Sequence, residues 1–280
     1  RWIMNINKLY QFYDFSGKTI VITGGAGVLC KEIALSLIDC DANVILIDKN
    51  IDMAEKVLKD AKVDTEKAIA IFGDVLEPET LQKSCDIILQ KFGKIDCLIN
   101  GAGGNNPKAT TNKEFSFFDI PEEALKFVID LNLLGTFLPS QIFGKEIAKQ
   151  NEGVILNISS MNAFRPLTRI PAYSASKAAV SNFTQWLAVY FAQEFSPNIR
   201  VNAIAPGFFL TEQNRFLLID KDTGKLTERG KKIIEHTPMN RFGEPSDLIG
   251  AVLWLLSPAS KFVTGIILPI DGGFSSYSGV

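Results

Sequence analysis

Residues 19–30 read TIVITGGAGVLC, a short apolar run that leads through a glycine-rich turn into a segment of helical length. Glycine lets a backbone approach a ligand closely, and the first amide groups of a helix attract anions. A strand, a glycine turn and a helix in this order indicate a pyrophosphate site, with tight packing of the helix on the strand as the alternative. The candidate contacts are Gly24, Gly25, Gly27, Val28 and Leu29.

The alternation of short apolar runs with longer amphipathic segments continues along the chain. Segments such as Pro78–Phe92 repeat apolar residues every three to four positions, as helices do. Strands that are apolar on both faces and joined by helices indicate a parallel sheet covered on both sides. The sequence therefore predicts one α/β domain, doubly wound and Rossmann-like, with a seven-stranded parallel sheet. The expected strands are Thr19–Thr23, Asn43–Ile47, Ala68–Phe72, Cys97–Asn100, Val154–Ser159, Arg200–Ala205 and Ile266–Pro269.

The composition excludes several classes of protein. With 280 residues, 46% of them hydrophobic, and a net charge of −2, the chain can bury a large core and has no electrostatic reason to bind nucleic acid or an anionic membrane. No apolar run reaches the roughly 18 residues of a membrane span, and no secretion signal is visible. Four cysteines without a CxxC pair and a single histidine indicate free thiols and no metal site. We expect a cytoplasmic protein.

The domain is expected to cover residues 18–280 after an N-terminal extension, residues 1–17, whose first three residues precede Met4 and are interpreted as an expression remnant. Two connections, residues 103–120 and 206–244, are too long to be turns. Both follow a predicted strand, and ligands of open α/β sheets bind at the carboxyl ends of the strands. The sequence predicts a substrate pocket there, with residues 206–244 as its lid.

Asp48 ends the second predicted strand, 24 residues after Gly24. A carboxylate at about this spacing accepts hydrogen bonds from the adenosine ribose hydroxyls and repels a 2′-phosphate, which favours NAD over NADP. Lys49 beside it keeps NADP possible, and a helix cap is the alternative role of Asp48.

Tyr173 and Lys177 lie four residues apart in a predicted helix and therefore share one face. A cation beside a phenol favours phenolate, which suits proton transfer in alcohol oxidation. An ordinary pair on a helix surface is the alternative.

Together these motifs resemble the short-chain dehydrogenase/reductase family from Lys18 to about Gly273. The resemblance also rests on Asp74, Asn100-Gly101-Ala102-Gly103, Asn132, Ser159-Ser160 and Pro206-Gly207 leading to Thr211. It implies that Tyr173 is the general acid/base and that Lys177 binds the nicotinamide ribose and lowers the pKa of Tyr173. It further implies that Ser160, 13 positions before Tyr173, holds the reacting oxygen, and that Asn132 anchors a water relay.

The resemblance also implies where the dinucleotide lies. Asp74 would contact the adenine, Asn100 and Gly101 would lie along the cofactor, and Thr211 would meet the carboxamide. The further contacts it implies are Val75, Ala102, Pro206, Gly207 and Phe209, together with Asp48, Lys49, Tyr173 and Lys177. The later two glycines of the family turn are Val28 and Cys30 here. We expect a shifted turn in which Gly27 supplies the conformational freedom and Cys30 is small enough for packing.

Residues 103–111, 160–164, 206–215 and 271–280 are similar to the bacterial D-mannonate oxidoreductase (fructuronate reductase) group of this family. The implied reaction interconverts D-mannonate and D-fructuronate. The alternatives are a gluconate 5-dehydrogenase or another sugar-acid or polyol dehydrogenase and, beyond these, an acyl-thioester reductase or a non-catalytic cofactor sensor.

Amide side chains suit the hydroxyls of a sugar acid, and basic side chains suit its carboxylate. Each could instead be a turn former or a solvated charge. His236 is interpreted as structural. Relatives of this family are usually tetramers, which implies an interface over Asn132–Gln150, Ser174–Phe195 and Ile266–Val280. The candidate substrate residues are Asn105, Asn106, Asn162, Arg165, Arg169, Gln213, Asn214 and Arg215, with Lys108 as a further cation.

Overall fold

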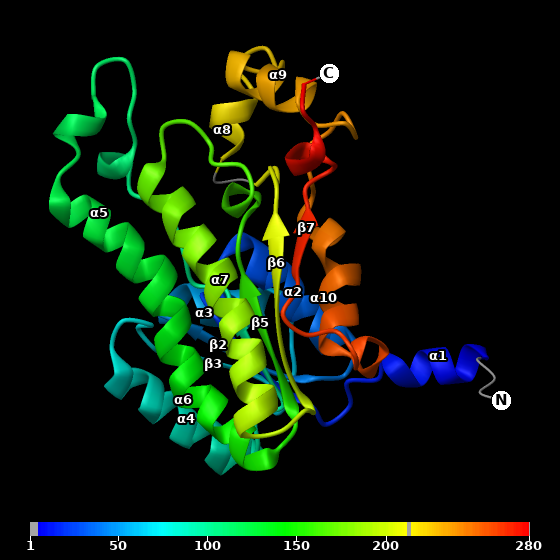
Figure 1. Ribbon diagram of the computed structural model, residues 1–280. Coiled ribbons are helices and arrows are strands. Elements are labelled where there is room, and N and C mark those ends of the chain that lie inside the picture. Colours follow the sequence, from blue (N-terminus) through cyan, green and yellow to red (C-terminus); the bar gives the residue numbers. More distant parts are fainter. Residues whose placement is uncertain (1–4, 212–213, 280) are drawn as a thin grey trace.

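The computed structural model describes residues 5–211 and 214–279, and within them the chain forms one sheet of seven parallel strands (Figure 1). The strand order is β3-β2-β1-β4-β5-β6-β7, so the winding reverses between β1 and β4. The predicted fold class is confirmed, and the predicted strand limits differ from those observed by about one residue. The strands are β1 (Thr19–Thr23), β2 (Asn43–Asp48), β3 (Ala68–Phe72), β4 (Cys97–Asn100), β5 (Gly153–Ile158), β6 (Ile199–Pro206) and β7 (Ile267–Ile270).

Helices cover both faces of the sheet. One face carries α2 (Val28–Asp39), α3 (Ile51–Asp60) and α10 (Ile249–Leu256). The other carries α4 (Pro78–Phe92), α6 (Gly135–Gln150) and α7 (Pro171–Glu194). Beyond the carboxyl ends of β6 and β7, Figure 1 shows α8, α9 and the C-terminal segment close together. The remaining helices are α1 (Ile6–Phe12), α5 (Glu122–Ile129), α8 (Arg215–Leu218) and α9 (Glu228–Glu235).

Alternating side chains of the buried strands supply two separate cores. In β1, Ile20 and Ile22 belong to the core shared with α2, α3 and α10, whereas Val21 belongs to the core shared with α4, α6 and α7. These three residues are fully buried, and each such side chain stabilises the fold by about 1.5–3 kcal/mol relative to an exposed one. Apolar runs without polar alternation, the feature that predicted this sheet, are the consequence of covering both faces.

The N-terminal extension is not separate from the domain. Phe15 is only 3% exposed and packs in the first core, so the packing of the domain begins before Lys18. The preceding helix α1 projects away from the body of the molecule (Figure 1).

Helices α5 and α6 are joined by a π-helical turn, Asp130–Leu134, into one helix from Glu122 to Gln150. By length and mean hydropathy, 1.2 over its most apolar window, this helix could cross a membrane. It is the one such helix among the described residues, and sequence inspection, which counted only strand-sized runs, did not anticipate it. In the fold, 44% of that window is buried, and Phe143 and Ile147 lie in the second core against β4 and β5. Packing against the sheet therefore accounts for these apolar residues.

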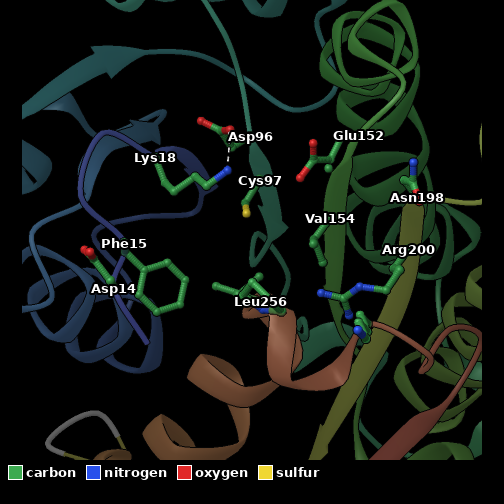
Figure 2. A pocket seen from close by; sticks show the side chains of 13 residues that line it. Asp14, Phe15, Lys18, Asp96, Cys97, Glu152, Val154, Asn198, Arg200 and Leu256 are labelled. Atoms are coloured by element: carbon green, nitrogen blue, oxygen red, sulfur yellow. Dashed lines mark hydrogen bonds and ion pairs between the residues drawn. The ribbon is translucent and has the colours of Figure 1, made fainter. Parts of the chain in front are cut away.

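A hollow of about 370 Å³ lies at the amino-terminal edge of the sheet (Figure 2). On one side, the Lys18 ammonium contacts the Asp96 carboxylate at 3.2 Å. On the other, the buried Arg200 guanidinium donates to the carbonyl oxygens of Leu255, at 2.8 Å, and Ser257, at 3.1 Å. Carbonyl groups at a helix C-terminus lack partners within the helix and carry partial negative charge, so Arg200 caps α10.

Candidate active site

A second hollow, of about 330 Å³, lies at the opposite edge, where β1, β4, β5 and β6 end. This edge, beside the reversal of winding, is where open α/β sheets bind ligands. Nine of the predicted cofactor contacts line the hollow, and so does Ser160. The predicted contacts are Gly27, Val28, Leu29, Gly101, Tyr173, Pro206, Gly207, Phe209 and Thr211. Asn214, a candidate substrate residue, also lines the hollow, and the lining residues that were not among the predicted site residues are Cys30, Gly103, Ile158 and Phe208.

The glycine turn after β1 depends on Gly24. Gly24 has a φ of +63°, and a Cβ there would lie 2.8 Å from the backbone of Ala102. Gly27 has a φ of −64°, which any residue can adopt, so the expectation that Gly27 supplies the conformational freedom is wrong. The expectation for Cys30 holds, because its Sγ occupies the space that a Cβ on Gly101 would need.

The start of α2 suits an anion. Gly27 is the N-cap residue, and among the described residues no side chain caps the first turn of the helix. Uncapped amide groups at a helix N-terminus bind phosphate oxygens. The close approach at Gly24 and the free first turn of α2 together fit the pyrophosphate of a dinucleotide.

Asp48 binds the glycine turn directly. Its Oδ2 accepts from the Ala26 amide at 3.0 Å, and its Oδ1 accepts from the Asn50 amide at 2.9 Å. Each carboxylate oxygen has a second lone pair, so the side chain can also accept from ribose hydroxyls. Asp48 therefore has a structural role in addition to the predicted one.

Lys49 and Asp74 form an ion pair, with Lys49 Nζ 2.7 Å from Asp74 Oδ2. Burial alone would raise the pKa of Asp74, but the Lys49 ammonium and the Leu76 amide hold it below its usual value. The Lys49 ammonium is thus already engaged by a carboxylate. Val75, the next predicted contact, is buried and packs against Gly135.

Ser160, Tyr173 and Lys177 come together at the end of β5 and the start of α7. A hydrogen bond links Ser160 and Tyr173. Lys177 Nζ donates to the Ile158 carbonyl at 2.7 Å and lies 5.7 Å from the centroid of the Tyr173 ring. Ser159, the neighbouring candidate, instead contacts Ser181 on α7 at 2.7 Å. The arrangement places Ser160, and not Ser159, beside the phenol.

Burial controls the titration of the two groups. It raises the pKa of Tyr173, although the hydrogen bond with Ser160 acts in the other direction. It lowers the pKa of Lys177, which is 4% exposed, to about 8. The expectation that Lys177 lowers the pKa of Tyr173 is therefore not met, because burial and Ser160 set the value.

Asn132 lies in the π-helical turn, a feature often found at functional sites. Its amide nitrogen donates to the Gly104 carbonyl at 2.7 Å and to the Val128 carbonyl at 2.8 Å. A Cβ on Gly103 would lie 2.8 Å from Asn132 Oδ1 and 3.2 Å from Lys177 Nζ. The structure therefore brings Asn132 close to Lys177, across Gly103.

Two buried asparagines among the predicted site residues bind protein groups. The Asn100 amide donates to Ser140 at 2.9 Å and to Asn157 at 2.8 Å, and so joins β4 to α6 and β5. The Asn162 carbonyl accepts from Ser174 and the Leu167 amide, both at 3.0 Å. Asn162 also donates to Ser160 Oγ at 3.2 Å, and this hydrogen bond orients the serine side chain.

Other predicted substrate amides stabilise loops. Asn105 donates to Thr110 at 2.9 Å, Asn106 caps a short turn through the Lys108 amide, and Asn214 binds the Thr211 amide at 2.9 Å. These are the turn-forming roles that the sequence left open. Gln213 lies outside the described residues. Arg215 is exposed at the start of α8 and lines neither this hollow nor the one beside it.

A larger hollow, of about 720 Å³, adjoins the cleft that contains Ser160 and Tyr173, and Phe208 lines both. It contains Arg165 and Arg169, two of the predicted carboxylate ligands. It is also lined by Arg229, Lys232 and His236 from α9 and its end. Sequence reasoning missed Arg229 and Lys232, whose spacing of three in α9 places them on one face of the helix.

The chain belongs to the short-chain dehydrogenase family, whose model matches residues 18–221. It is an oxidoreductase that acts on alcohol groups.

An uncharacterised oxidoreductase of Haemophilus influenzae is 50% identical over 96% of each chain. A crystal structure from Haemophilus influenzae, provisionally assigned as a D-mannonate oxidoreductase and with bound NAD, is 49% identical and has a TM-score of 0.89, covering 97% of this chain and 100% of its own. The 5-keto-D-gluconate 5-reductase of Escherichia coli K12 is 33% identical over 94% of this chain and 97% of its own.

Proposed function

We propose that the protein is an NAD(H)-dependent dehydrogenase of a sugar acid, interconverting D-mannonate and D-fructuronate. The observation that carries this proposal is the position of Ser160 and Tyr173 in a cleft that shares Phe208 with a hollow lined by cations. A hydroxyl group and a carboxylate of one small molecule would then find separate partners. The likeness to the provisionally assigned D-mannonate oxidoreductase supports the same substrate.

The nicotinamide cofactor, when bound, supplies or accepts the hydride. The turn at Gly24 and the first turn of α2 would hold its pyrophosphate, and Asp48 its adenosine ribose. Asp48 disfavours a 2′-phosphate, and Lys49 is engaged by Asp74, which supports NAD over NADP. The NAD bound by the Haemophilus structure agrees with this preference.

The protein's own part in the reaction is the movement of one proton. Because burial raises the pKa of Tyr173, its phenol stays protonated at neutral pH and can donate to the oxygen of a ketone during reduction. In oxidation the same atom receives the hydroxyl proton. Ser160, held by Asn162, donates a hydrogen bond to the reacting oxygen. Lys177, charged below a pKa of about 8, binds the nicotinamide ribose, and Asn132 anchors a water relay behind it.

The proposal includes a homotetramer in the cytoplasm. Phe137, Phe183, Trp186 and Tyr190 line an apolar hollow on α6 and α7, where Trp186 is 57% exposed. Stacked aromatic side chains on an open helical face support burial by another copy. Cys30, Cys85 and Cys97 are buried free thiols, which fits a reducing compartment. Light scattering of the purified protein would test the assembly.

The test of function is steady-state oxidation of D-mannonate, D-gluconate and D-mannitol, each with NAD and with NADP. We expect the highest kcat/KM for D-mannonate with NAD. Preferred turnover of D-gluconate would change the proposed substrate but keep the proposed reaction class. Turnover of none of the sugar acids, with NADH still bound, would refute the proposal.

A further inference from the structure

The hollow beside the catalytic cleft carries an excess of positive charge. Its basic side chains are Arg165 and Arg169 on one wall and Arg229 and Lys232 on the other. The one carboxylate among its lining residues, Glu228, is paired with Lys231 at 3.0 Å. Within residues 5–211 and 214–279, none of the four cations forms an ion pair. Solvated cations are common on protein surfaces, but four cations that line one hollow, with no ion-pair partner among the described residues, raise the local potential for an anion.

Both walls are held in place by specific contacts. The wall that contains Arg165 is tied to the C-terminal segment, because Arg165 Nε donates to the Ser275 carbonyl at 3.1 Å. The Arg169 carbonyl accepts from the Thr111 amide at 2.8 Å. These contacts leave the outer nitrogens of Arg165 and the whole Arg169 guanidinium available to a ligand.

The opposite wall, α9, is anchored to α8. The Thr227 hydroxyl donates to the Leu217 carbonyl at 2.7 Å and accepts from the Gly230 amide at 3.0 Å. Gly230 and Ile233 are the buried residues of α9. Arg229 and Lys232, which are exposed, line the hollow from the same short helix.

Phe208 and Phe274 supply apolar surface between the walls, with ring centroids 5.2 Å apart in an edge-to-face arrangement. Ligand pockets are commonly apolar with a few polar groups that fix orientation. Phe208 also lines the cleft of Ser160 and Tyr173, so this ring borders both cavities.

We propose that Arg229 and Lys232, together with Arg165 and Arg169, bind the carboxylate of the substrate. The inference rests on the proposed function and specifies it further. The cations and the pair of Ser160 and Tyr173 line different cavities that share Phe208, so the acid proposed here carries its carboxylate several carbon atoms from its reacting carbon. A 2-hydroxy acid, whose two groups are adjacent, does not span Phe208. Arg229 and Lys232 are thus specificity-determining residues on the lid.

The experiment compares the double variant Arg229→Gln/Lys232→Gln with Lys225→Gln, a matched control that removes an exposed lid cation outside the hollow. In the double variant we expect KM for D-mannonate to rise about tenfold or more, with kcat nearly unchanged, because charge-assisted hydrogen bonds are lost. The KM of the wild type should rise with salt concentration, and the KM of the double variant should rise less. The control should match the wild type in both measurements. NADH fluorescence titration should give the same affinity for all three proteins.

The inference is overturned if the double variant and Lys225→Gln have the same KM and salt dependence. It is also overturned if the wild type oxidises D-lactate or D-glycerate as well as D-mannonate. Both results leave the proposed function standing. If the wild type oxidises no sugar acid, the proposed function fails and this inference fails with it.

Discussion

Replacing Lys177 by methionine should stabilise the ligand-free protein at neutral pH while removing its activity. Methionine fills a similar volume without a charge, and Lys177 is almost completely buried. Its pKa falls from an ordinary 10.5 to about 8, because burial penalises the ammonium form. A stability cost of this kind is expected where a buried charge is kept for function.

The size of the cost follows from the pKa. At about 1.4 kcal/mol per pKa unit, the shift from 10.5 to about 8 corresponds to about 3 kcal/mol against folding at neutral pH. The variant also leaves the Ile158 carbonyl without the hydrogen bond from Nζ, which costs about 1–2 kcal/mol. The net stabilisation expected at pH 7 is about 2 kcal/mol.

The pH dependence gives a sharper test. Between pH values of about 8 and 10.5 the folded protein has released the Lys177 proton while the unfolded chain still binds it. Unfolding then takes up a proton, so rising pH increasingly opposes unfolding. From pH 7 to 9.5 the wild type should gain about 2 kcal/mol relative to Lys177→Met.

Urea unfolding of both proteins, at one protein concentration and without nucleotide, measures this difference. Most other groups titrate alike in the two proteins, so their contributions cancel in the comparison. Equal pH dependence of the free energy of unfolding in both proteins would refute the reasoning.

Four further outcomes are expected. Tyr173→Phe should reduce kcat by at least about 10²-fold while NADH affinity, measured by fluorescence, stays the same; retained turnover would exclude this phenol as the acid/base. Asp48→Asn keeps an acceptor for the Ala26 amide and should raise the ratio of NADP to NAD turnover by about tenfold; an unchanged ratio would argue against charge repulsion at this position. Arg200→Met should lower the free energy of unfolding by about 3 kcal/mol, seen in urea titrations, because α10 loses its cap, and kcat per folded molecule should not change. Gly230→Ala should raise KM for the substrate, because the new methyl group would overlap the carbonyl of the preceding lid helix; a normal KM would show that α9 can shift.

The sheet could be predicted from the sequence because burial on both faces leaves a direct mark. Val21 and Ile22 serve different cores, so the strand shows no polar alternation and reads as a continuous apolar run. The order of the strands and the place of Phe15 in the core could not be predicted from a local sequence pattern. They depend on contacts between segments far apart in the chain.

The proximity of Tyr173 and Lys177 could also be predicted, because their spacing is local to one helix. The direction of the Tyr173 pKa could not, since it depends on burial by distant segments. Asn162 was correctly placed near the site but is used to position Ser160. Arg229 lines the same hollow as Arg165 and Arg169 because α9 lies beyond the carboxyl ends of β6 and β7, a long-range arrangement that residue type alone does not reveal.

The uncapped first turn of α2 couples the stability of the fold to binding of the dinucleotide. Bound phosphate oxygens would accept from the first amide groups of a helix that no side chain caps within the part of the chain that the structure describes. Anything that binds only the folded state shifts unfolding by mass action, by about 2.7 kcal/mol at a hundredfold excess over Kd. The resistance of this protein to unfolding should therefore follow the concentration of its cofactor, so that a cell depleted of the nucleotide loses the enzyme as well as its activity.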